Sequence, residues 1–355
     1  MSTAVRRGRL VAGFALVAIL GGIVGGWLVR ATSSTGSTGG ATTCDATEVA
    51  DRALPSTVTI RASDGHQGGS GSGVIIRSGG YIVTNDHVIA VAAHGGSLSV
   101  LYSDGRASEA SLVGRDPSTD LAVIKAADGA PNLPVIPLGS SSSLQVGQPV
   151  VALGAPLGLS STVTSGIGSA LNRDVPVQSA TGQSAFLIGA IQTDASINPG
   201  NSGGALVDCA AQLIGINTAG ATVPNAAGET GGGSVGLGFA VPVDLAEPLT
   251  TELIASGSVN HPSFGMQVQA ISRELAQQAG VSPGLYVQEL TPGGPAEEAG
   301  IRPGDIIVEI DGRAAGSADE LLVTTLTKDA GDTVQVTYQR GGVSTTTTLT
   351  LAPQR

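Results

Sequence analysis

The sequence predicts a mainly β protein with two folded domains and one apolar segment near its amino terminus. Two observations predict the domains and their β character, and two more exclude other classes of protein. The 355 residues exceed the length of a usual single domain. Short β-rich runs bounded by Gly, Pro, Asn, Asp or Ser recur along the chain. Glycine is abundant at 53 residues, yet follows no Gly-X-Y period, so collagen is excluded. The 41% of hydrophobic residues excludes a wholly disordered chain.

The first element is an apolar segment at residues 10–29, LVAGFALVAILGGIVGGWLV, which we expect to be a transmembrane anchor. As a helix its twenty uncharged residues would be about 30 Å long, which matches a bilayer core. Three arginines precede it and one follows, so residues 1–9 are expected in the cytoplasm and the folded domains outside it. The alternative is a cleaved secretory signal, but its apolar region would be unusually long and no clear cleavage site follows Trp27.

Residues 30–43 are rich in Ser, Thr and Gly and predict a linker with nothing to bury. Residues 44–257 then read as an all-β barrel or sandwich closed by a helix at Asp244–Ser256. A break at residues 257–261 precedes a second domain, at 262–353, that mixes strands and helices. The strands expected in the first domain are Thr57–Arg61, Gly73–Ile76, Ile82–Thr84, Ser97–Tyr102, Leu121–Lys125, Pro149–Gly154, Gln212–Thr218 and Gly238–Val241. The helices expected in the second are Ser272–Ala279, Pro295–Ala299 and Ala318–Asp329.

Charge and composition exclude several kinds of partner. The chain has 17 basic and 28 acidic residues, a net charge of −11. Four arginines lie in the first thirty residues, which leaves 13 basic and 28 acidic residues, a charge of −15, on the remainder. This balance argues against sequence-independent phosphate binding, so no nucleic acid partner is expected. The two cysteines and four histidines show no metal-ligand spacing, so no metal is expected.

The stretch NPGNSGG at residues 198–204 has the features of an acyl-transfer nucleophile turn. Such a serine needs a tight turn beside backbone N–H groups that are free to meet an oxyanion. Gly200, two positions before Ser202, lets the backbone take an unusual conformation and turn its amide inward. Taken alone, however, a Gly/Asn/Ser turn is usually only a turn.

The stretch YIVTNDHVI places His87 after an apolar strand and a polar step. A base on a short helical turn at the end of a strand is well held for proton transfer. The alternative interpretation is a capping or loop histidine.

Asp120 directly precedes the apolar strand that begins at Leu121, where an aspartate has low β propensity. It either caps the preceding turn or orients an imidazole. Asp86 is a poorer orienting group for His87, because neighbouring side chains in an extended segment diverge. The aspartates in turn-like contexts, expected to be structural, are Asp104, Asp116 and Asp194.

Together, the three stretches favour catalysis. His87, Asp120 and Ser202 are separated by 33 and 82 residues and occur in the chymotrypsin-type order. The all-β character of the first domain agrees independently with that order.

With these motifs in place, the chain resembles the HtrA/Deg serine proteases from about residue 44 to residue 355. The stretches that carry the resemblance are TNDHV, DPSTDLAVIK and NPGNSGGALVD, with LIGINTAG and GLGFAVP downstream. The resemblance implies a trypsin-like double β-barrel protease domain at 44–257 and an α+β PDZ domain at 262–353.

The resemblance also implies roles for particular residues. His87 matches the general base, Asp120 its orienting partner and Ser202 the nucleophile, and the amides of Gly200 and Ser202 match the oxyanion hole. No metal or organic cofactor is needed for this chemistry. The residues that match loops beside the primary specificity pocket are Asn217, Thr218, Ala219, Gly220, Gly236, Leu237 and Gly238.

In the second domain, Ser263, Phe264, Gly265 and Met266 resemble the PDZ carboxylate loop. Backbone amides there could bind the terminal carboxylate of a peptide, and the strand edge at 267–269 could accept the peptide as an added strand. Ser263 departs from the usual Gly or aromatic residue. The alternative is a domain that folds without binding peptides.

Two functional hypotheses follow. In the first, the chain is a membrane-anchored serine endopeptidase, in the cell membrane with its protease and PDZ domains extracytoplasmic, that cleaves misfolded or exposed polypeptides. In the second, it is a peptide-binding scaffold or chaperone whose protease fold is idle. The intact triad favours the first. HtrA relatives are commonly trimers, so a homotrimer is expected, although residues 44–60 lack the aromatic side chains usual at that contact.

The two cysteines, Cys44 and Cys209, are predicted to form a disulfide. Both are expected outside the cytoplasm, where disulfides persist and free thiols are not expected. The alternative is two free thiols, one of them in a disordered flank.

Overall fold

The computed structural model describes residues 44–155, 162–178, 184–220 and 234–353. The predicted anchor and linker therefore lie outside the described residues. Among the ranges that are described, no helix is long and apolar enough to cross a membrane.

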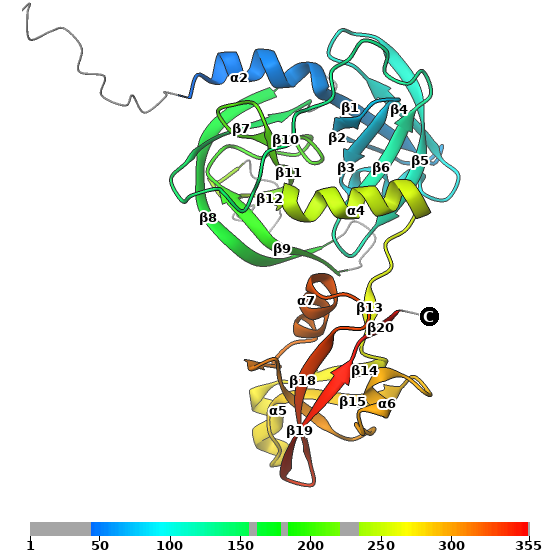
Figure 1. The fold of residues 1–355 in the computed structure, drawn as a ribbon, viewed down its shortest axis with the longest axis vertical. Coiled ribbons are helices and arrows are strands. Elements are labelled where there is room, and N and C mark those ends of the chain that lie inside the picture. The colour runs from blue at the N-terminus through cyan, green and yellow to red at the C-terminus, as the bar shows by residue number, and fades with distance from the viewer. Residues whose placement is uncertain (1–43, 156–161, 179–183, 221–233, 354–355) are drawn as a thin grey trace, which may run out of the picture. The chain divides into compact units, whose positions relative to one another are not determined.

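The first domain consists of two closed antiparallel β-barrels of six strands each (Figure 1). The first barrel is built from β1 (Thr57–Ser63), β2 (Gly68–Arg77), β3 (Tyr81–Thr84), β4 (Ser97–Leu101), β5 (Ala107–Asp116) and β6 (Leu121–Ala126). The second is built from β7 (Pro149–Gly154), β8 (Thr162–Gln178), β9 (Ser184–Thr193), β10 (Ala205–Val207), β11 (Leu213–Gly220) and β12 (Gly238–Pro242). The strand orders are β1-β2-β3-β6-β5-β4 and β10-β11-β12-β9-β8-β7. The double-barrel prediction is confirmed.

Strand β6 shows how the sequence builds both sides of a barrel wall. Five of its six residues are buried, and only Lys125 is exposed. Ala122 and Ile124 point into the core of the first barrel, whereas Leu121 belongs to a core that also contains residues of the second barrel. The period of two in a strand therefore supplies two hydrophobic cores from one continuous apolar run.

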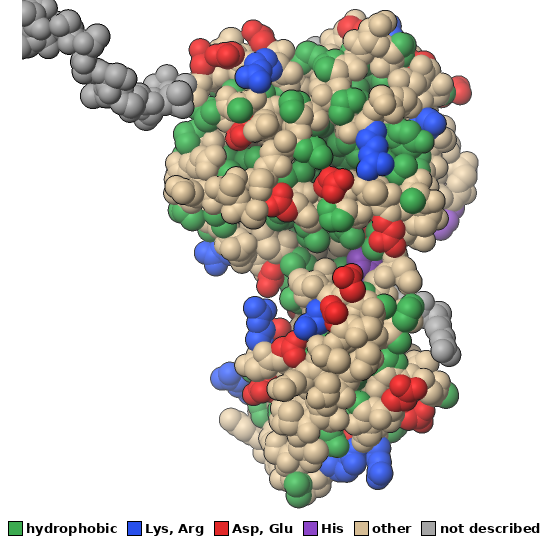
Figure 2. Space-filling view, viewed as in Figure 1, with side chains coloured by type: hydrophobic (Ala, Val, Ile, Leu, Met, Phe, Trp, Pro, Cys, Tyr) green, Lys and Arg blue, Asp and Glu red, His purple; other side chains and the backbone are tan. Residues whose placement is uncertain are grey.

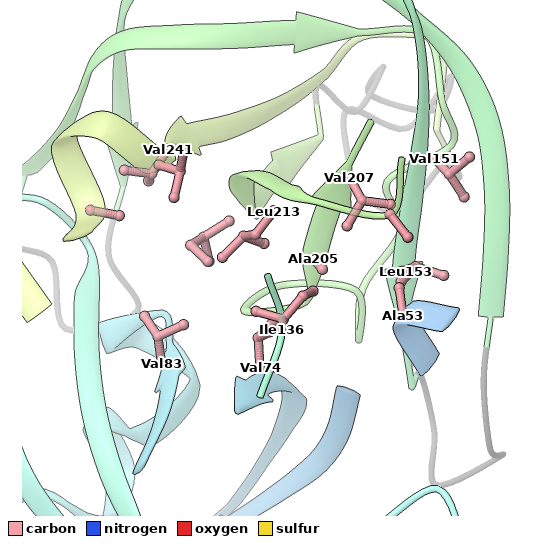
Figure 3. Packing of buried hydrophobic residues seen from close by; sticks show 14 of the residues in the cluster. Ala53, Val74, Val83, Ile136, Val151, Leu153, Ala205, Val207, Leu213 and Val241 are labelled. Carbon is pink, nitrogen blue, oxygen red and sulfur yellow. The ribbon is translucent and has the colours of Figure 1, made fainter. Parts of the chain in front are cut away.

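A hydrophobic core lies where the two barrels meet (Figure 3). Val74 and Val83 reach it from the first barrel, and Val151, Leu213 and Val241 reach it from the second. All five side chains are at most 1% exposed. This shared core fixes the barrels against each other and so fixes any site that spans them.

Helix α2 (Ala46–Ala53) was not predicted from the sequence, which shows little helical periodicity before residue 244. Asp45 caps it by accepting hydrogen bonds from the amides of Thr47 and Glu48, and three buried residues share one face. That face packs into the core of Figure 3, where Ala53 lies near residues of the second barrel. The helix precedes the first barrel in sequence but packs on the second.

The cysteines that flank this region are joined. The sulfurs of Cys44 and Cys209 are bonded, and their Cα atoms lie 5.1 Å apart. The bond ties the start of α2 to the segment that follows β10 and closes a loop of 165 residues.

The closing helix predicted at Asp244–Ser256 is α4 (Val243–Ser256), which ends at Gly257 in a left-handed conformation. Asp244 in its first turn accepts hydrogen bonds from the amides of Ser141 and Ser142. A Cβ on Gly114 would meet the carbonyl of Gly257 at 2.6 Å, so glycine at 114 lets the helix end pack on the first barrel. The domain boundary predicted at residues 257–261 therefore begins with the C-cap of this helix.

The second domain contains three short helices and a six-stranded sheet, one strand of which pairs off the main path. Its main sheet has the order β14 (Met266–Ile271), β15 (Gly284–Leu290), β16 (Ile306–Ile310), β18 (Thr333–Arg340) and β19 (Val343–Thr350). Its helices are α5 (Arg273–Ala279), α6 (Pro295–Glu298) and α7 (Asp319–Thr327), and its short strands are β13 (Pro262–Ser263), β17 (Arg313–Ala314) and β20 (Ala352–Pro353). The three predicted helices are present within two residues at each end. Strand β14 lies at one edge of the sheet, as an acceptor of an added strand requires.

On the face shown in Figure 2, acidic and basic side chains are interspersed among apolar and polar ones.

Candidate active site

His87 lies on the short helix α3 (Asp86–Ile89), which follows directly after β3 and Asn85. Its Nδ1 is 2.9 Å from both carboxylate oxygens of Asp120, and its backbone amide donates to Oδ1 at 3.1 Å. The carboxylate therefore holds both the ring and the backbone of the histidine. This contact leaves Nε2 as the ring nitrogen available to a third group.

Asp120 has a left-handed backbone, with φ of 56°, which is uncommon for a residue other than glycine. Its carbonyl accepts hydrogen bonds from the Asn85 side chain at 2.9 Å and from the Asp86 amide at 3.1 Å. Its carboxylate accepts a further bond from the Thr218 hydroxyl at 2.5 Å. These contacts offset the cost of the conformation and point the 5% exposed side chain at His87.

Ser202 lies in the tight turn before β10. Glycines at 200 and 203 have φ of 100° and 83°, and a Cβ at 203 would clash with the carbonyl of Ser72 and the hydroxyl of Thr84. The Ser202 hydroxyl donates to the carbonyl of Thr218 at 2.8 Å. Within the described residues no hydrogen bond joins Ser202 to His87, so the serine occupies a resting orientation.

The amides of Gly200 and Ser202 belong to the nucleophile turn. Neither amide donates to an acceptor within the described ranges, whereas those of Asn201 and Gly203 donate to the carbonyls of Asn198 and Asn217. These two N–H groups are therefore available to a bound substrate, as an oxyanion hole requires.

The electrostatic surroundings of His87 favour its protonated form. Burial lowers its pKa, but the hydrogen bond and the negative charge of Asp120, together with the charge of Asp86, outweigh burial and raise the pKa above its ordinary value. This is the shift expected of a base that must become an imidazolium during a reaction.

Asp86 does not contact the imidazole, in agreement with the expectation that it orients His87 poorly. Its carboxylate, 1% exposed, accepts two hydrogen bonds from Arg115 at 2.5 and 2.6 Å. The pair fixes α3 to β5, since Arg115 lies near the end of that strand. Burial raises the pKa of Asp86 even though Arg115 acts in the opposite direction.

The aspartates expected to be structural have local partners. Asp104 pairs with Arg106 at 2.8 Å, and Asp194 accepts a bond from the amide of Ile167 at 2.7 Å. Asp116 accepts from the hydroxyl of Thr119 at 2.5 Å and contacts Nε2 of His261 at 2.8 Å. None of these partners belongs to the catalytic group.

The residues predicted to border a specificity pocket fall into two groups, with buried and with exposed side chains. The Asn217 side chain is fully buried and donates to the carbonyls of Leu153 and Ala205, and Thr218 is 4% exposed and bonded to Asp120. Their side chains are therefore supports of the site, while the carbonyl of Thr218 faces Ser202. Leu237 is 41% exposed, and a Cβ on Gly238 would clash with the side chain of Ile197. For Ala219, Gly220 and Gly236 the structure gives the backbone, with the first two at the end of β11.

The predicted carboxylate loop at Ser263–Met266 turns sharply at Gly265, where φ is 67°. Its Gly265 amide donates to the Ser263 hydroxyl at 3.0 Å, and the Phe264 side chain is buried in the domain core. One of the amides expected to bind a carboxylate is therefore already bonded inside the loop.

Several contacts of the site were missed from the sequence, above all the bond from Thr218 to Asp120 and the Arg115–Asp86 pair. No local pattern marks them, since the partners are 98 and 29 residues apart. The polar residues Asn85 and Asp86 before His87 were the one hint in the sequence. Their role is seen only in the structure, where both donate to the carbonyl of Asp120, which has a left-handed backbone.

Comparison with known proteins identifies both domains. A family described as "Trypsin-like peptidase domain" matches residues 71–216, and a family described as "PDZ domain" matches residues 262–351.

Curated relatives match both domains. The chain is 42% identical over 311 residues to the serine protease PepD of Mycobacterium tuberculosis, covering 86% of this chain and 65% of PepD. It is 39% identical over 305 residues to the serine protease Do-like HtrA of Lactococcus lactis subsp. lactis, covering 82% of this chain and 72% of that one. The chain spans between 56% and 65% of the length of the first four curated relatives that it matches.

A solved structure described as "HtrA-type protease AlgW with decapeptide" superposes with a TM-score of 0.66. It is 33% identical to this chain, and the match covers 88% of this chain and 99% of that one.

Proposed function

Because the chain belongs to the HtrA/DegP family of trypsin-like serine proteases that carry a PDZ domain, we propose that it is a membrane-anchored, extracytoplasmic serine endopeptidase. Its substrates are misfolded or exposed polypeptides. Two features of the site support the proposal. His87 is paired with Asp120, and among the described residues two amides of the nucleophile turn have no hydrogen-bond acceptor.

The proposed reaction begins with attack of Ser202 Oγ on a peptide carbonyl. His87 Nε2 takes the hydroxyl proton during attack and then gives it to the leaving amine, which yields an acyl-enzyme. Asp120 holds the ring in the tautomer with a proton on Nδ1 and stabilises the imidazolium. Water repeats the sequence on the acyl-enzyme and releases the second fragment. None of these steps uses a metal or an organic cofactor.

The resting orientation of Ser202 adds a step to this reaction. Its hydroxyl donates to Thr218 O and must rotate about χ1 to reach His87. Rotation is compatible with an active enzyme, because catalytic hydrogen bonds often form only when substrate binds.

The amides of Gly200 and Ser202 would bind the oxyanion of the tetrahedral intermediate. A donor that is already in place lowers the barrier without reorganisation, and loss of one such donor typically costs about 10²–10³ in turnover. Leu237, Gly238 and the backbone at 217–220 would lie beside the side chain that precedes the cleaved bond.

The PDZ domain would bind the carboxy termini of peptides, with β14 as the edge that accepts an added strand. Its carboxylate loop must first release the Gly265 amide from the Ser263 hydroxyl. Full-chain Ser202→Ala protein should therefore bind apolar peptide acids weakly and the same peptides with amidated termini much more weakly. Equal binding of the two forms would reject this mode.

The extracytoplasmic location is supported by relatives. Two of them, from Halomonas elongata and Haemophilus influenzae, are named as probable periplasmic proteases. The Cys44–Cys209 bond fits an oxidising compartment. The anchor at residues 10–29 and the homotrimer remain predictions, which protease protection of intact cells and mass measurement would respectively test.

The central test is cleavage of an unfolded protein by the purified full chain. The wild type should release fragments with new termini, and a fluorophosphonate probe should label Ser202. Ser202→Ala should do neither while unfolding at an unchanged urea concentration. Protection of the unfolded protein without fragments would instead support the scaffold hypothesis.

A further inference from the structure

We propose that Ser72 is a positioning residue for the nucleophile turn: its buried hydroxyl holds the backbone between the two oxyanion-hole amides. The inference rests on the proposed function. It means that a residue of the first barrel positions the nucleophile turn, which belongs to the second barrel.

Ser72 lies in β2 and is fully buried. Its hydroxyl donates to the carbonyl of Gly200 at 2.7 Å and accepts from the amide of Ala155 at 2.8 Å. Its own amide donates to the carbonyl of Ser202 at 2.8 Å. One residue of the first barrel thus bonds two residues of the nucleophile turn and the end of β7.

The other atoms of Ser72 are also occupied. Its carbonyl accepts from the Thr84 hydroxyl at 2.7 Å, and its backbone is paired with Thr59 in β1. Every polar group of the residue therefore has a partner: β1 and the end of β3 hold its backbone, and the nucleophile turn and the end of β7 hold its hydroxyl.

The approach of β2 to the turn requires glycine on both sides. A Cβ on Gly203 would clash with the carbonyl of Ser72, and a Cβ on Gly71 would meet the carbonyl of Ser202 at 3.0 Å and the Val88 side chain at 2.6 Å. The strand and the turn are consequently in backbone contact, with no room for a water-filled gap.

The position of the Gly200 carbonyl explains why this contact bears on catalysis. Between the amide of Gly200 and that of Ser202 the backbone contains two carbonyls. The first is held by Ser72, and the second, of Asn201, accepts from the amide of Gly204 at 2.9 Å. Loss of the Ser72 hydroxyl frees the first carbonyl and leaves the buried Ala155 amide without its acceptor, so the turn can rearrange.

A purely structural serine would behave differently, and the chain offers a matched control. Thr57 is a buried residue of β1 whose hydroxyl donates to the carbonyl of Ala53 at 3.4 Å and, among the described residues, makes no hydrogen bond to the nucleophile turn. Ser72→Ala and Thr57→Val each remove one buried hydroxyl from the first barrel. Only the first removes it from the nucleophile turn.

The experiment compares full-chain wild type, Ser72→Ala and Thr57→Val for peptide cleavage, fluorophosphonate labelling rate and amide exchange. For Ser72→Ala we expect kcat and the labelling rate to fall by about 10- to 100-fold with KM nearly unchanged, since displaced oxyanion donors act on the transition state. Amide exchange in residues 199–204 should accelerate in the same variant. Thr57→Val should keep wild-type kcat and wild-type exchange in that segment.

Equal kcat, labelling and exchange in Ser72→Ala and Thr57→Val would overturn the inference. If Ser72→Ala fails to fold, Ser72→Cys decides, because a thiol of similar size is a weaker donor and acceptor. Its kcat should fall with KM unchanged, and wild-type kcat would count against the proposal. A wild type that neither cleaves nor reacts would refute the proposed function alone, and amide exchange would still decide the role of Ser72.

Discussion

The two barrels supply the proposed catalytic residues in different arrangements. The first supplies His87 and Asp120 already in hydrogen-bonding geometry, with the Asp120 backbone held by Asn85 and Asp86. The second supplies Ser202, whose hydroxyl is bonded to Thr218. In the proposed mechanism, His87 and Asp120 are therefore already arranged for proton transfer, and Ser202 is the group that must move.

Hydrogen bonds between the barrels make the two parts of the site depend on each other. Thr218 of the second barrel donates to Asp120, and Ser72 of the first bonds the turn that carries Ser202. Each barrel thus bonds a proposed catalytic residue, or its turn, in the other barrel. Removing these bonds one at a time tests how much each barrel depends on the other.

The largest effect should come from removing one catalytic group from each barrel. His87→Ala and Ser202→Ala should each reduce kcat by at least about 10⁴-fold, and the double variant should be barely worse than either, because triad members act as a unit. Single-turnover cleavage of a peptide substrate measures all three. Additive losses would show that the two barrels act independently.

The disulfide should have the next largest effect, on stability. It ties Cys44, at the start of the protease domain, to the second barrel. The chain-entropy relation gives a bond closing 165 residues about 5 kcal/mol, with smaller values often measured. Reduced protein should unfold at a clearly lower urea concentration than oxidised protein. Non-reducing peptide mapping should yield a Cys44–Cys209 species, and alkylation of both sulfurs without reduction would contradict it.

Thr218→Val removes the bond that the second barrel gives to Asp120. A hydrogen bond to a charged group is worth about 1.5–3 kcal/mol, so we expect kcat to fall by roughly 10- to 150-fold. Thr250→Val is a suitable control, since its buried hydroxyl bonds Glu247 within α4. Unchanged turnover in Thr218→Val would mean that the first barrel orients Asp120 unaided.

The smallest effect concerns pH. The raised pKa of His87 means that the acid limb of kcat/KM, where the base becomes protonated, should lie above pH 6.5. The sign for stability is opposite: a raised folded pKa adds stability fully below the unfolded value, and this stability is lost as pH rises through the folded pKa. NMR titration of His87 in Ser202→Ala checks both, and a midpoint below 6.5 would contradict them.

The sequence predicted what local patterns encode. Each of the eight strands expected in the first domain overlaps an observed strand, and Pro149–Gly154 coincides with β7. Strands β5, β8, β9 and β10 are not among those eight. Strand β8 shows why: it contains Gly166, Gly168 and many half-exposed residues, so apolar alternation is weak.

The candidate site divides in the same way. Motifs with fixed neighbours, around His87, Asp120 and Ser202, could be recognised in one sequence. The hydroxyls of Ser72 and Thr218 could not, because a buried serine or threonine gains its role from a partner more than 90 residues away.

Helix α2 has a consequence for the order of folding. Its buried residues Val49 and Ala53 share a core with Val241 and Ala246, about 200 residues later in the chain. A chain that grows from its amino terminus therefore presents the apolar face of this helix long before the partner surface exists, and contacts of such high sequence separation form slowly. We expect the helix to dock last, so that formation of the Cys44–Cys209 bond reports the completion of the second barrel during biogenesis.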